Sequence, residues 1–380
     1  MTQNPKRNLV GRILIGTGVA IASGYVLYKY AMHKMEESSQ KQVKERQARQ
    51  NLRVRFEQNQ KDATALTLKL VPVVSAQLFP VLGVEDITAA LQKLRVNPEQ
   101  LSPADAKIRK TELWETLKIA SFTRTVAALY LINLLYVFSH IQLSIIGRYT
   151  YMSSVSSATH DLAIETERKF LTFSWYLLHK GLFECTARVK QAVEHVFAGV
   201  SISDDISCDE LLAHVASIRS NVEEWSIDGS LLTFGFDSYL LPSVGQEVTT
   251  LKEASGRNDI TFDETFLKYV NETRDFLEGP DFTLVFRKCL DKSFGVLESH
   301  IRTSLFTESV ADQGERITEI TSDGPTKIKL ATSLPAMSRF ASDVLQVDTE
   351  NRVLNVLDAV PEVKALCTLI YTEWSSVTDS

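Results

Sequence analysis

The stretch Val126–Ile146 reads VAALYLINLLYVFSHIQLSII and decides the fold. It lies inside a longer segment, Lys107–Ile146, that contains neither glycine nor proline and therefore predicts one continuous helix. Apolar residues cover most sides of that helix, which is typical of a helix at the centre of a bundle. Its polar side chains would each need a hydrogen-bond partner in lipid: Thr125, Asn133, Ser139, His140, Gln142 and Ser144. We therefore expect a buried core helix, with a second membrane crossing as the alternative.

Amphipathic patterns continue after this segment and predict further helices. They cover residues 158–200, 209–225, 262–277, 282–306, 335–347 and 353–374. Strand signals are confined to Ser230–Leu241 and Ile317–Lys329, and neither stretch shows a hairpin partner. Residues 245–259 and 311–332 are polar and rich in turn-forming residues, which predicts mobile loops. The predicted fold is all-α: an elongated helical bundle with an N-terminal transmembrane helix and a long basic stalk helix.

The region before the core helix predicts a stalk that leads into the bundle. Residues 36–62 are charged and rich in glutamine, without glycine or proline, as in a solvated helix. Apolar residues become denser towards Pro72, where we expect this helix to kink or end. A short helix is predicted at Glu85–Leu94, followed by a loop over residues 96–106.

The amino-terminal segment Ile13–Ala31 predicts a membrane anchor, because at about 1.5 Å per residue it spans roughly 28 Å. Arg12, Lys29 and Lys34 flank the anchor, where long basic side chains can reach the lipid head groups. The expected domains are a short tail inside the organelle (1–12), the transmembrane anchor (13–31) and a cytosolic helical-bundle domain (32–380), whose residues 32–62 form the stalk.

The charge distribution sets the expected orientation. Of the 41 basic and 47 acidic side chains, residues 1–60 hold 11 and 4, a formal charge of +7, which leaves −13 for the remaining 320 residues. More basic residues follow the anchor than precede it, which places the body in the cytosol by the positive-inside rule. A basic arm on an acidic body suits contact with membrane lipids and argues against nucleic acid as a partner. Lys6, Arg7 and the Ala20–Ala22 trio imitate a cleavable signal peptide, which is the alternative to an anchor.

The sequence contains no motif for catalysis or metal binding. Its four cysteines lie far apart without a CxxC pair, which indicates reduced thiols. Its seven histidines are scattered without an HExxH motif, and Gly-Thr-Gly at 16–18 falls inside the anchor instead of following a strand. We expect a protein that is not an enzyme and needs no cofactor and no metal.

The stretch Glu112–Tyr151 reads ELWETLKIASFTRTVAALYLINLLYVFSHIQLSIIGRYTY. Its Trp-Glu-x-Leu-Lys-Ile block, Ser-Phe-Thr-Arg at 121–124 and Ile-Ile-Gly at 145–147 resemble the signature region of the peroxin-3 family. A looser match covers the anchor and the stalk, and beyond about residue 180 only length and helical character match. The resemblance implies a single-pass protein of the peroxisomal membrane, reached directly or through the endoplasmic reticulum.

The same resemblance implies a function in peroxisome biogenesis. A groove at the membrane-distal end of the bundle is expected to dock an amphipathic helix from the amino-terminal end of peroxin-19, the soluble chaperone and import receptor. Cargo-loaded peroxin-19 then delivers peroxisomal membrane proteins for insertion. A membrane tether or scaffold on another organelle, with a different helical partner, is the alternative.

The Trp-Glu-x-Leu-Lys helix lines the partner groove in the family, which carries the partner-binding role over to Lys110, Trp114, Leu117 and Lys118. Their spacing is expected to place them on one helix face, and Leu91 in the preceding short helix is added to the site. An aromatic anchor beside aliphatic carbon and two cations suits a partner helix with apolar anchors and acidic edges. The sequence pattern alone favours a core position for Trp114. The resemblance to the family favours a partner-binding position instead.

Thr150 departs from the family pattern, in which an aliphatic residue between the two tyrosines is expected to add to the groove. A threonine there predicts weaker binding or an adapted partner helix. Phe122, Arg124 and Tyr130 are assigned to a packed core with one internal charge that needs a partner.

Overall fold

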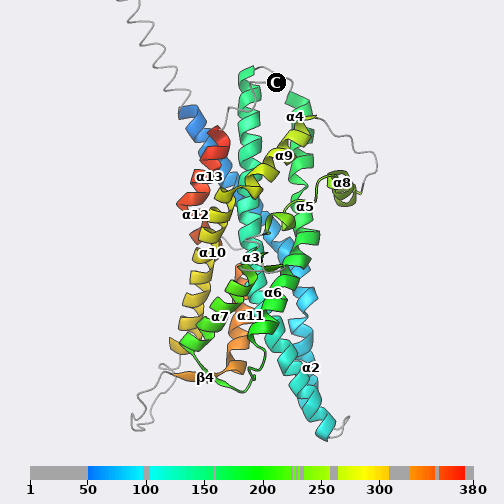
Figure 1. Ribbon diagram of the computed structural model, residues 1–380, viewed down its shortest axis with the longest axis vertical. Helices are drawn as coiled ribbons and strands as arrows, with labels where there is room; N and C mark the ends of the chain where they lie inside the picture. Colours follow the sequence, from blue (N-terminus) through cyan, green and yellow to red (C-terminus); the bar gives the residue numbers. More distant parts are fainter. Residues whose placement is uncertain are drawn as a thin grey trace, which may run out of the picture. The chain divides into compact units, whose positions relative to one another are not determined.

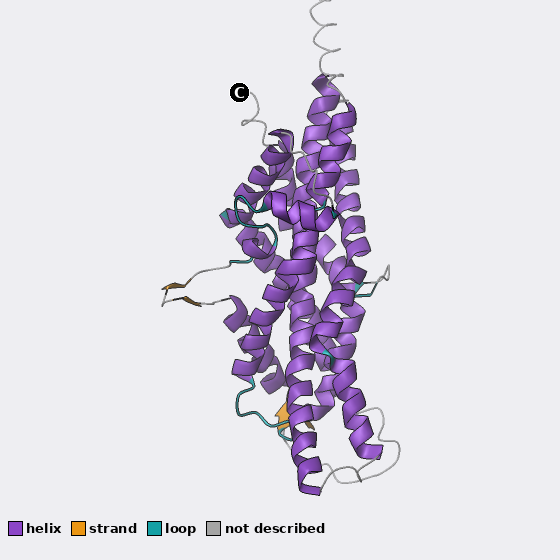
Figure 2. Cartoon of the chain, turned by 90° about the vertical axis from the view of Figure 1, so that its right-hand side faces the viewer, coloured by secondary structure: helices purple, strands orange, loops and turns teal. Residues whose placement is uncertain are grey.

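The computed structural model describes residues 50–96, 103–156, 160–223, 226–227, 230–231, 235–256, 264–307, 326–346 and 351–372. Helices make up nearly all of this part of the chain, so the predicted all-α bundle is confirmed (Figure 2). The chain divides into two compact units, Met1–Gln58 and Asn59–Ser380. The predicted anchor, its flanks Arg12, Lys29 and Lys34, and the stalk before residue 50 lie outside the described residues.

Helix α3 (Pro103–Ser156) runs through the middle of the bundle (Figure 1). It packs against α2 (Val84–Val96), α6 (Leu182–Val196), α10 (Pro280–Ile301), α11 (Leu330–Val344) and α13 (Pro361–Thr372). Every residue of α3 from 120 to 142 is buried. The helix is long and apolar enough to cross a membrane, but 94% of its most apolar stretch is buried inside the protein. It is therefore the expected core helix, and burial argues against the alternative of a second crossing.

Gly147 lies inside α3, although the sequence suggested that the helix would end there. A Cβ atom at this position would come within 2.8 Å of the Tyr371 ring and 3.1 Å of the Asn59 side chain. The glycine therefore permits the close approach of two neighbouring side chains to α3. It does not mark the end of the helix.

Two helices lead into α3. The first described helix, Gln50–Leu82, contains an apolar stretch long enough to span a membrane by length and composition, of which 28% is buried. Val71, Val74 and Leu78 are its buried residues nearest α2. The helix does not end at Pro72, because this proline is exposed and water can hydrogen-bond the carbonyl that lost its N–H partner. It ends at Leu82, and the next residue, Gly83, has a φ of 54° that allows the turn into α2.

The helices after α3 lie where the sequence predicted them, but some of the predicted helices are divided into several shorter ones. The single helix predicted over residues 158–200 consists of α4 (His160–Leu171), α5 (Ser174–Tyr176), the π-helical turn η2 (Leu177–Gly181) and α6. The others correspond to α7 (Cys208–Glu223), α9 (Glu264–Glu278), α10 with the π-helical η4 (Arg302–Thr307), α11, and α12 (Arg352–Asp358) with α13. Pro361 divides the last pair because it begins a new helix, a position that tolerates its missing N–H.

Two expectations for the polar segments are wrong: Ser230–Leu241 does have a hairpin partner, and one of the predicted loops contains a helix. β1 (Asp205–Ser207) pairs antiparallel with β4 (Lys327–Lys329), and β2 (Ser226–Ile227) pairs with β3 (Ser230–Leu231), so both strand signals have partners. Strands of two or three residues are too short for a period-2 pattern to reveal a partner far along the chain. The predicted loop over 245–259 contains the short helix α8 (Glu247–Ser255). Most of the other predicted loop, residues 311–325, lies outside the described residues.

Several polar side chains of α3 have hydrogen-bond partners in the core, as is usual for buried polar groups. Asn133 donates to the Ser293 hydroxyl at 2.9 Å, and Tyr136 donates to the Asp358 carboxylate at 2.9 Å. The buried Arg148 pairs with Glu272. These bonds tie α3 to α10, α12 and α9, and they fix which face of α3 meets each neighbour.

Candidate functional site

A groove of about 760 Å³ lies between α2, the amino-terminal part of α3 and α11. Its lining is Val84, Glu85, Thr88, Ala89, Leu91, Gln92, Leu94 and Arg95 from α2, Lys110, Trp114, Leu117 and Ser121 from α3, and Ala331, Leu334, Pro335 and Ser338 from α11. Four of the five predicted partner-binding residues, Leu91, Lys110, Trp114 and Leu117, thus lie in one groove, although they come from two helices.

Helix α2 forms one wall, and an ion pair holds this wall against the core. The Glu85 carboxylate, in the first turn of α2, lies 2.5 Å from Nη1 of Arg124 on α3. Arg124 is only 2% exposed, and its guanidinium lies 3.4 Å from the centre of the Phe79 ring. The predicted internal charge at Arg124 and its need for a partner are confirmed. Phe122 and Tyr130 are fully buried, also as expected.

Helix α3 forms the second wall with residues spaced by four and three along one stripe. Lys110 is exposed at the outer end, Trp114 is half-buried, and Leu117 is buried deeper in the groove. Arg95 on α2 is a second exposed cation of the lining. Burial therefore increases along α3 from a basic rim to an apolar interior.

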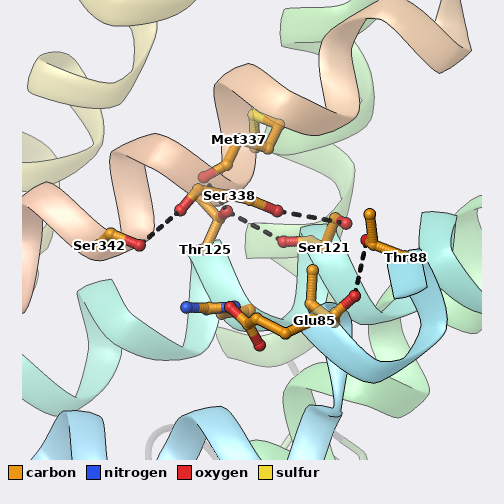
Figure 3. Close-up of polar contacts among 9 residues, drawn as sticks. Glu85, Thr88, Ser121, Thr125, Met337, Ser338 and Ser342 are labelled. Atoms are coloured by element: carbon orange, nitrogen blue, oxygen red, sulfur yellow. Dashed lines mark hydrogen bonds and ion pairs between the residues drawn. The ribbon is translucent and has the colours of Figure 1, made fainter. Parts of the chain in front are cut away.

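Helix α11 forms the third wall, and polar bonds hold it to α3 (Figure 3). Thr125 on α3 donates its hydroxyl to the Met337 carbonyl at 2.8 Å, and the Ser338 hydroxyl lies 3.5 Å from that of Ser121. In the same view Glu85 and Thr88 of α2 lie on the other side of Ser121. The three walls therefore meet around Ser121.

Pro335 lies inside α11, whereas the sequence predicted that the helix would begin there. The helix begins at Leu330 instead, because carbonyls of another segment accept its first N–H groups: Asp204 accepts from Leu330 at 3.0 Å and Ile202 accepts from Ala331 at 3.1 Å. Pro335 has no N–H to give to the Ala331 carbonyl four residues earlier. Since both residues line the groove, its wall contains a carbonyl without the usual helical bond.

Lys118 is not among the lining residues, contrary to the expectation that it shares the groove face. Its side chain is 2% exposed, and its ammonium lies 2.5 Å from both the Val200 carbonyl and the Glu115 carboxylate. The physical reason is that these two acceptors, behind the groove wall, hold the ammonium in the interior. Nearby, Phe197 places its ring 5.8 Å from the same nitrogen.

Thr150 also lies elsewhere, so the expectation that it affects the groove is wrong. It is 36 residues from Trp114 on the same helix, which at about 1.5 Å per residue is roughly 50 Å. Its hydroxyl donates to the Glu167 carboxylate at 3.0 Å. The threonine contributes to the packing of α3 against α4, at the opposite end of α3 from the groove.

Sequence reasoning missed the whole contribution of α11. Ala331, Leu334, Pro335 and Ser338 are more than 200 residues away from Trp114 in the chain. The amphipathic pattern predicted a helix there, but no local signal tells which surface of the bundle a distant helix will cover. On α2, Arg95 was missed because the helix was expected to end one residue earlier.

The groove has the chemistry of a binding surface. Apolar side chains form its interior and two cations stand in its lining, Arg95 and Lys110. Among the described residues, no group of three or more histidine, cysteine or acidic side chains could hold a metal ion. A partner with an apolar stripe and acidic neighbours is complementary to these three walls.

The described part of the chain is a helical bundle with an open groove between three of its helices. The family model for Peroxin-3 matches residues 6–107, 94–163 and 157–373, which cover most of the sequence. The chain belongs to the Peroxin-3 family. It is accordingly a peroxisomal membrane protein of peroxisome biogenesis, and its family is one of biogenesis factors and not of enzymes. This membership argues against the alternative of a scaffold on another organelle.

Curated relatives agree with the family over nearly the full length. Peroxisomal biogenesis factor 3 of Cricetulus longicaudatus is 28% identical over 381 residues, covering 98% of this chain and 96% of the relative. The Homo sapiens protein of the same name is 29% identical over 384 residues, with the same coverage. A Komagataella phaffii relative named as a peroxisomal membrane protein is 27% identical over 248 residues, covering 52% of this chain and 54% of the relative.

Proposed function

We propose that this protein docks peroxin-19 on the peroxisomal membrane by binding an amphipathic helix of peroxin-19 in the groove between α2, α3 and α11. Docking would bring cargo-loaded peroxin-19 to the membrane for insertion of peroxisomal membrane proteins. The observation that carries the proposal is the convergence of Leu91, Lys110, Trp114 and Leu117 on one groove. These residues come from two helices, and the resemblance to the family implies a partner-binding role for each of them.

The dimensions of the groove suit a short helix. Lys110 and Ser121 mark its extent on α3, and eleven residues at about 1.5 Å each give roughly 16 Å, or three helical turns. A helix of that length presents apolar anchors at positions i, i+3 or i+4, and i+7. Trp114 at half-burial offers a flat aromatic surface for the central anchor, as interface tryptophans commonly do.

The charges of the groove favour an acidic partner. Lys110 and Arg95 are both exposed and both line the groove, whereas the acidic Glu85 is engaged by Arg124. Acidic side chains along the partner helix would therefore meet two exposed positive charges in the groove. Residues 61–380 carry a formal net charge of −13, so an acidic partner would be attracted to this basic rim more than to the rest of the bundle.

The proposed membrane arrangement is a single amino-terminal anchor with the bundle in the cytosol. Support comes from the apolar span Ile13–Ala31 with its basic flanks and from the burial of α3, which leaves that second apolar helix inside the protein. Protease digestion of intact peroxisomes would test the topology. The bundle should be cleaved without detergent, and protection of the bundle would contradict the arrangement.

The binding test uses the full chain in lipid nanodiscs and a fluorescent peptide from the amino-terminal end of peroxin-19. Saturable binding by the wild type is expected. Trp114→Ala should cost about 2–4 kcal/mol of affinity, or roughly 30-fold to 900-fold, as truncated aromatic anchors do. Affinity would be read from fluorescence anisotropy, with far-ultraviolet circular dichroism as the check on folding.

Trp175→Ala is the matched control, because Trp175 lies in α5 and stacks on His179 outside the groove. It removes an indole of the same size from the same protein. Normal binding by Trp114→Ala would remove the groove from the proposal. Absence of binding by the folded wild type would refute the docking function itself.

A further inference from the structure

Lys118 connects α3 to a loop that in turn carries α11. The loop comprises residues 197–204, between α6 and β1, and is called the 197–204 loop below. The Lys118 ammonium donates to the Val200 carbonyl of this loop at 2.5 Å and pairs with Glu115 one turn back on α3. With only 2% of its side chain exposed, Lys118 has its charge committed to these contacts.

The 197–204 loop holds the first turn of α11. The carbonyls of Asp204 and Ile202 accept the N–H groups of Leu330 and Ala331 at 3.0 and 3.1 Å. The first N–H groups of a helix have no partner within the helix, so bonds of this kind fix where the helix begins and how it is oriented. The pairing of β1 with β4 continues the same connection just before α11.

We infer that Lys118 is a positioning residue: through the 197–204 loop it sets the separation of the α3 and α11 walls of the groove. The expected effect of Lys118 on peptide binding rests on the proposed function. The expected effect of Lys118 on the position of α11 does not. A continuous series of contacts runs from the Lys118 ammonium to the Val200 carbonyl, along the loop, and into the backbone of Ala331. Ala331 itself lines the groove, as does Leu117, the residue next to Lys118.

The two lysines of this helix segment therefore act differently. Lys110 is exposed in the groove and available to a partner, whereas Lys118 is buried behind it. A direct electrostatic contact weakens with salt, and its loss reduces the salt dependence of binding. A residue that acts on groove geometry should change affinity while leaving that salt dependence as it was.

The first experiment is amide hydrogen exchange, followed by mass spectrometry, on the full chain in detergent micelles without any partner. Lys118→Met keeps most of the aliphatic stem and removes the ammonium. Exchange at Leu330 and Ala331 should become roughly tenfold faster, because a hydrogen bond to a charged donor no longer holds the loop. Lys110→Met is the matched control and should leave this exchange unchanged.

The second experiment measures affinity for the peroxin-19 peptide over a range of salt concentrations. Lys118→Met should weaken binding by roughly tenfold with an unchanged salt dependence, while Lys110→Met should reduce the salt dependence itself. A reduced salt dependence in Lys118→Met would overturn the inference in favour of direct contact. If the wild type binds no peptide, the proposed function fails, and the exchange experiment still decides whether Lys118 positions α11.

Asp204→Ala gives a second perturbation in case Lys118→Met does not fold. The exposed Asp204 carboxylate accepts the Ser201 N–H at 2.8 Å and shapes the turn of the 197–204 loop. Its removal should also speed exchange at Leu330 and Ala331 without touching the core. Exchange at the wild-type rate in every variant that folds would show that the loop does not hold α11.

Discussion

Substitution of Gly181 by alanine should destabilise the bundle far more than a glycine-to-alanine change usually does. Gly181 ends η2, where this turn crosses η3 (Asp237–Tyr239). An added Cβ would lie 2.0 Å from the Tyr239 carbonyl oxygen and 2.8 Å from its carbonyl carbon. Ordinary non-bonded contacts between carbon atoms begin at about 3.5 Å, so two backbone segments would have to separate by more than about 1 Å.

The magnitude follows from two opposing effects. Overpacking of side chains costs about 1–3 kcal/mol, and here the obstacle is backbone, which cannot rotate away, so about 4 kcal/mol is expected. The better helix propensity of alanine returns about 1 kcal/mol, which leaves a net cost of about 3 kcal/mol. For a bundle of roughly 300 residues the unfolding entropy near Tm is about 0.6 kcal/mol/K, so Tm should fall by about 5 °C.

The assay is thermal unfolding of the full chain in detergent micelles, followed by far-ultraviolet circular dichroism. Gly295→Ala is the control, because Gly295 lies inside α10 with no neighbouring atom within 4 Å of its built Cβ. That variant should match or slightly exceed the wild-type Tm. Equal Tm values for Gly181→Ala and Gly295→Ala would refute the argument from close approach.

Two further predictions concern charges in the core. Glu85→Ala should lower the free energy of unfolding by about 3 kcal/mol, because it leaves the buried Arg124 without its carboxylate. Arg124→Met should lower it by less, because the remaining Glu85 carboxylate is 66% exposed and stays hydrated. Thermal unfolding measures both variants, and a larger loss in Arg124→Met than in Glu85→Ala would contradict this prediction. The buried His140 has its pKa lowered to about 4 by desolvation, so the unfolded chain takes up a proton between pH 6.5 and 4 that the folded chain does not. Stability should therefore fall by about 2 kcal/mol between pH 7 and 5, and a His140→Gln variant that keeps this loss would contradict the assignment.

The helical elements were predictable because their signal is periodic and repeated. The long segment without proline or glycine around Val126–Ile146 defined α3, and its saturation with apolar residues indicated a central position. The breaks between helices were less predictable. The turn at residues 172–173 separates α4 from α5, and Gly181 in η2 lies against the backbone of Tyr239, more than 50 residues later. No window of local sequence contains that contact.

Two of the three walls of the groove, α2 and α3, could be predicted from the sequence. Leu91 and Trp114 lie in consecutive helices, and short connections make consecutive helices neighbours. The α11 wall depends on a long-range packing choice that the sequence does not display locally. Lys118 shows the limit of helical spacing as a guide: it is one residue from Leu117, yet two acceptors behind the wall direct its ammonium into the interior.

The Asp228-Gly229 pair is a strong two-residue hairpin signal that pattern reasoning overlooked between β2 and β3. This hairpin does not affect the description of the groove, because none of its strand residues lines it. The pairing of β1 with β4 matters more, since it anchors the start of α11. Only its β4 half carried a strand signal, and the two strands are about 120 residues apart in the sequence.

The position of α3 has a consequence for synthesis of the protein. Its covering helices α10, α11 and α13 are encoded far downstream, and the last of them ends at Thr372. At about 5–20 residues per second, a ribosome needs roughly 10–40 s after completing α3 to make them. During that time the nascent chain contains a segment that is long and apolar enough to cross a membrane and that lacks these covering helices. The core around α3 is therefore complete only after the carboxyl-terminal helices have been made.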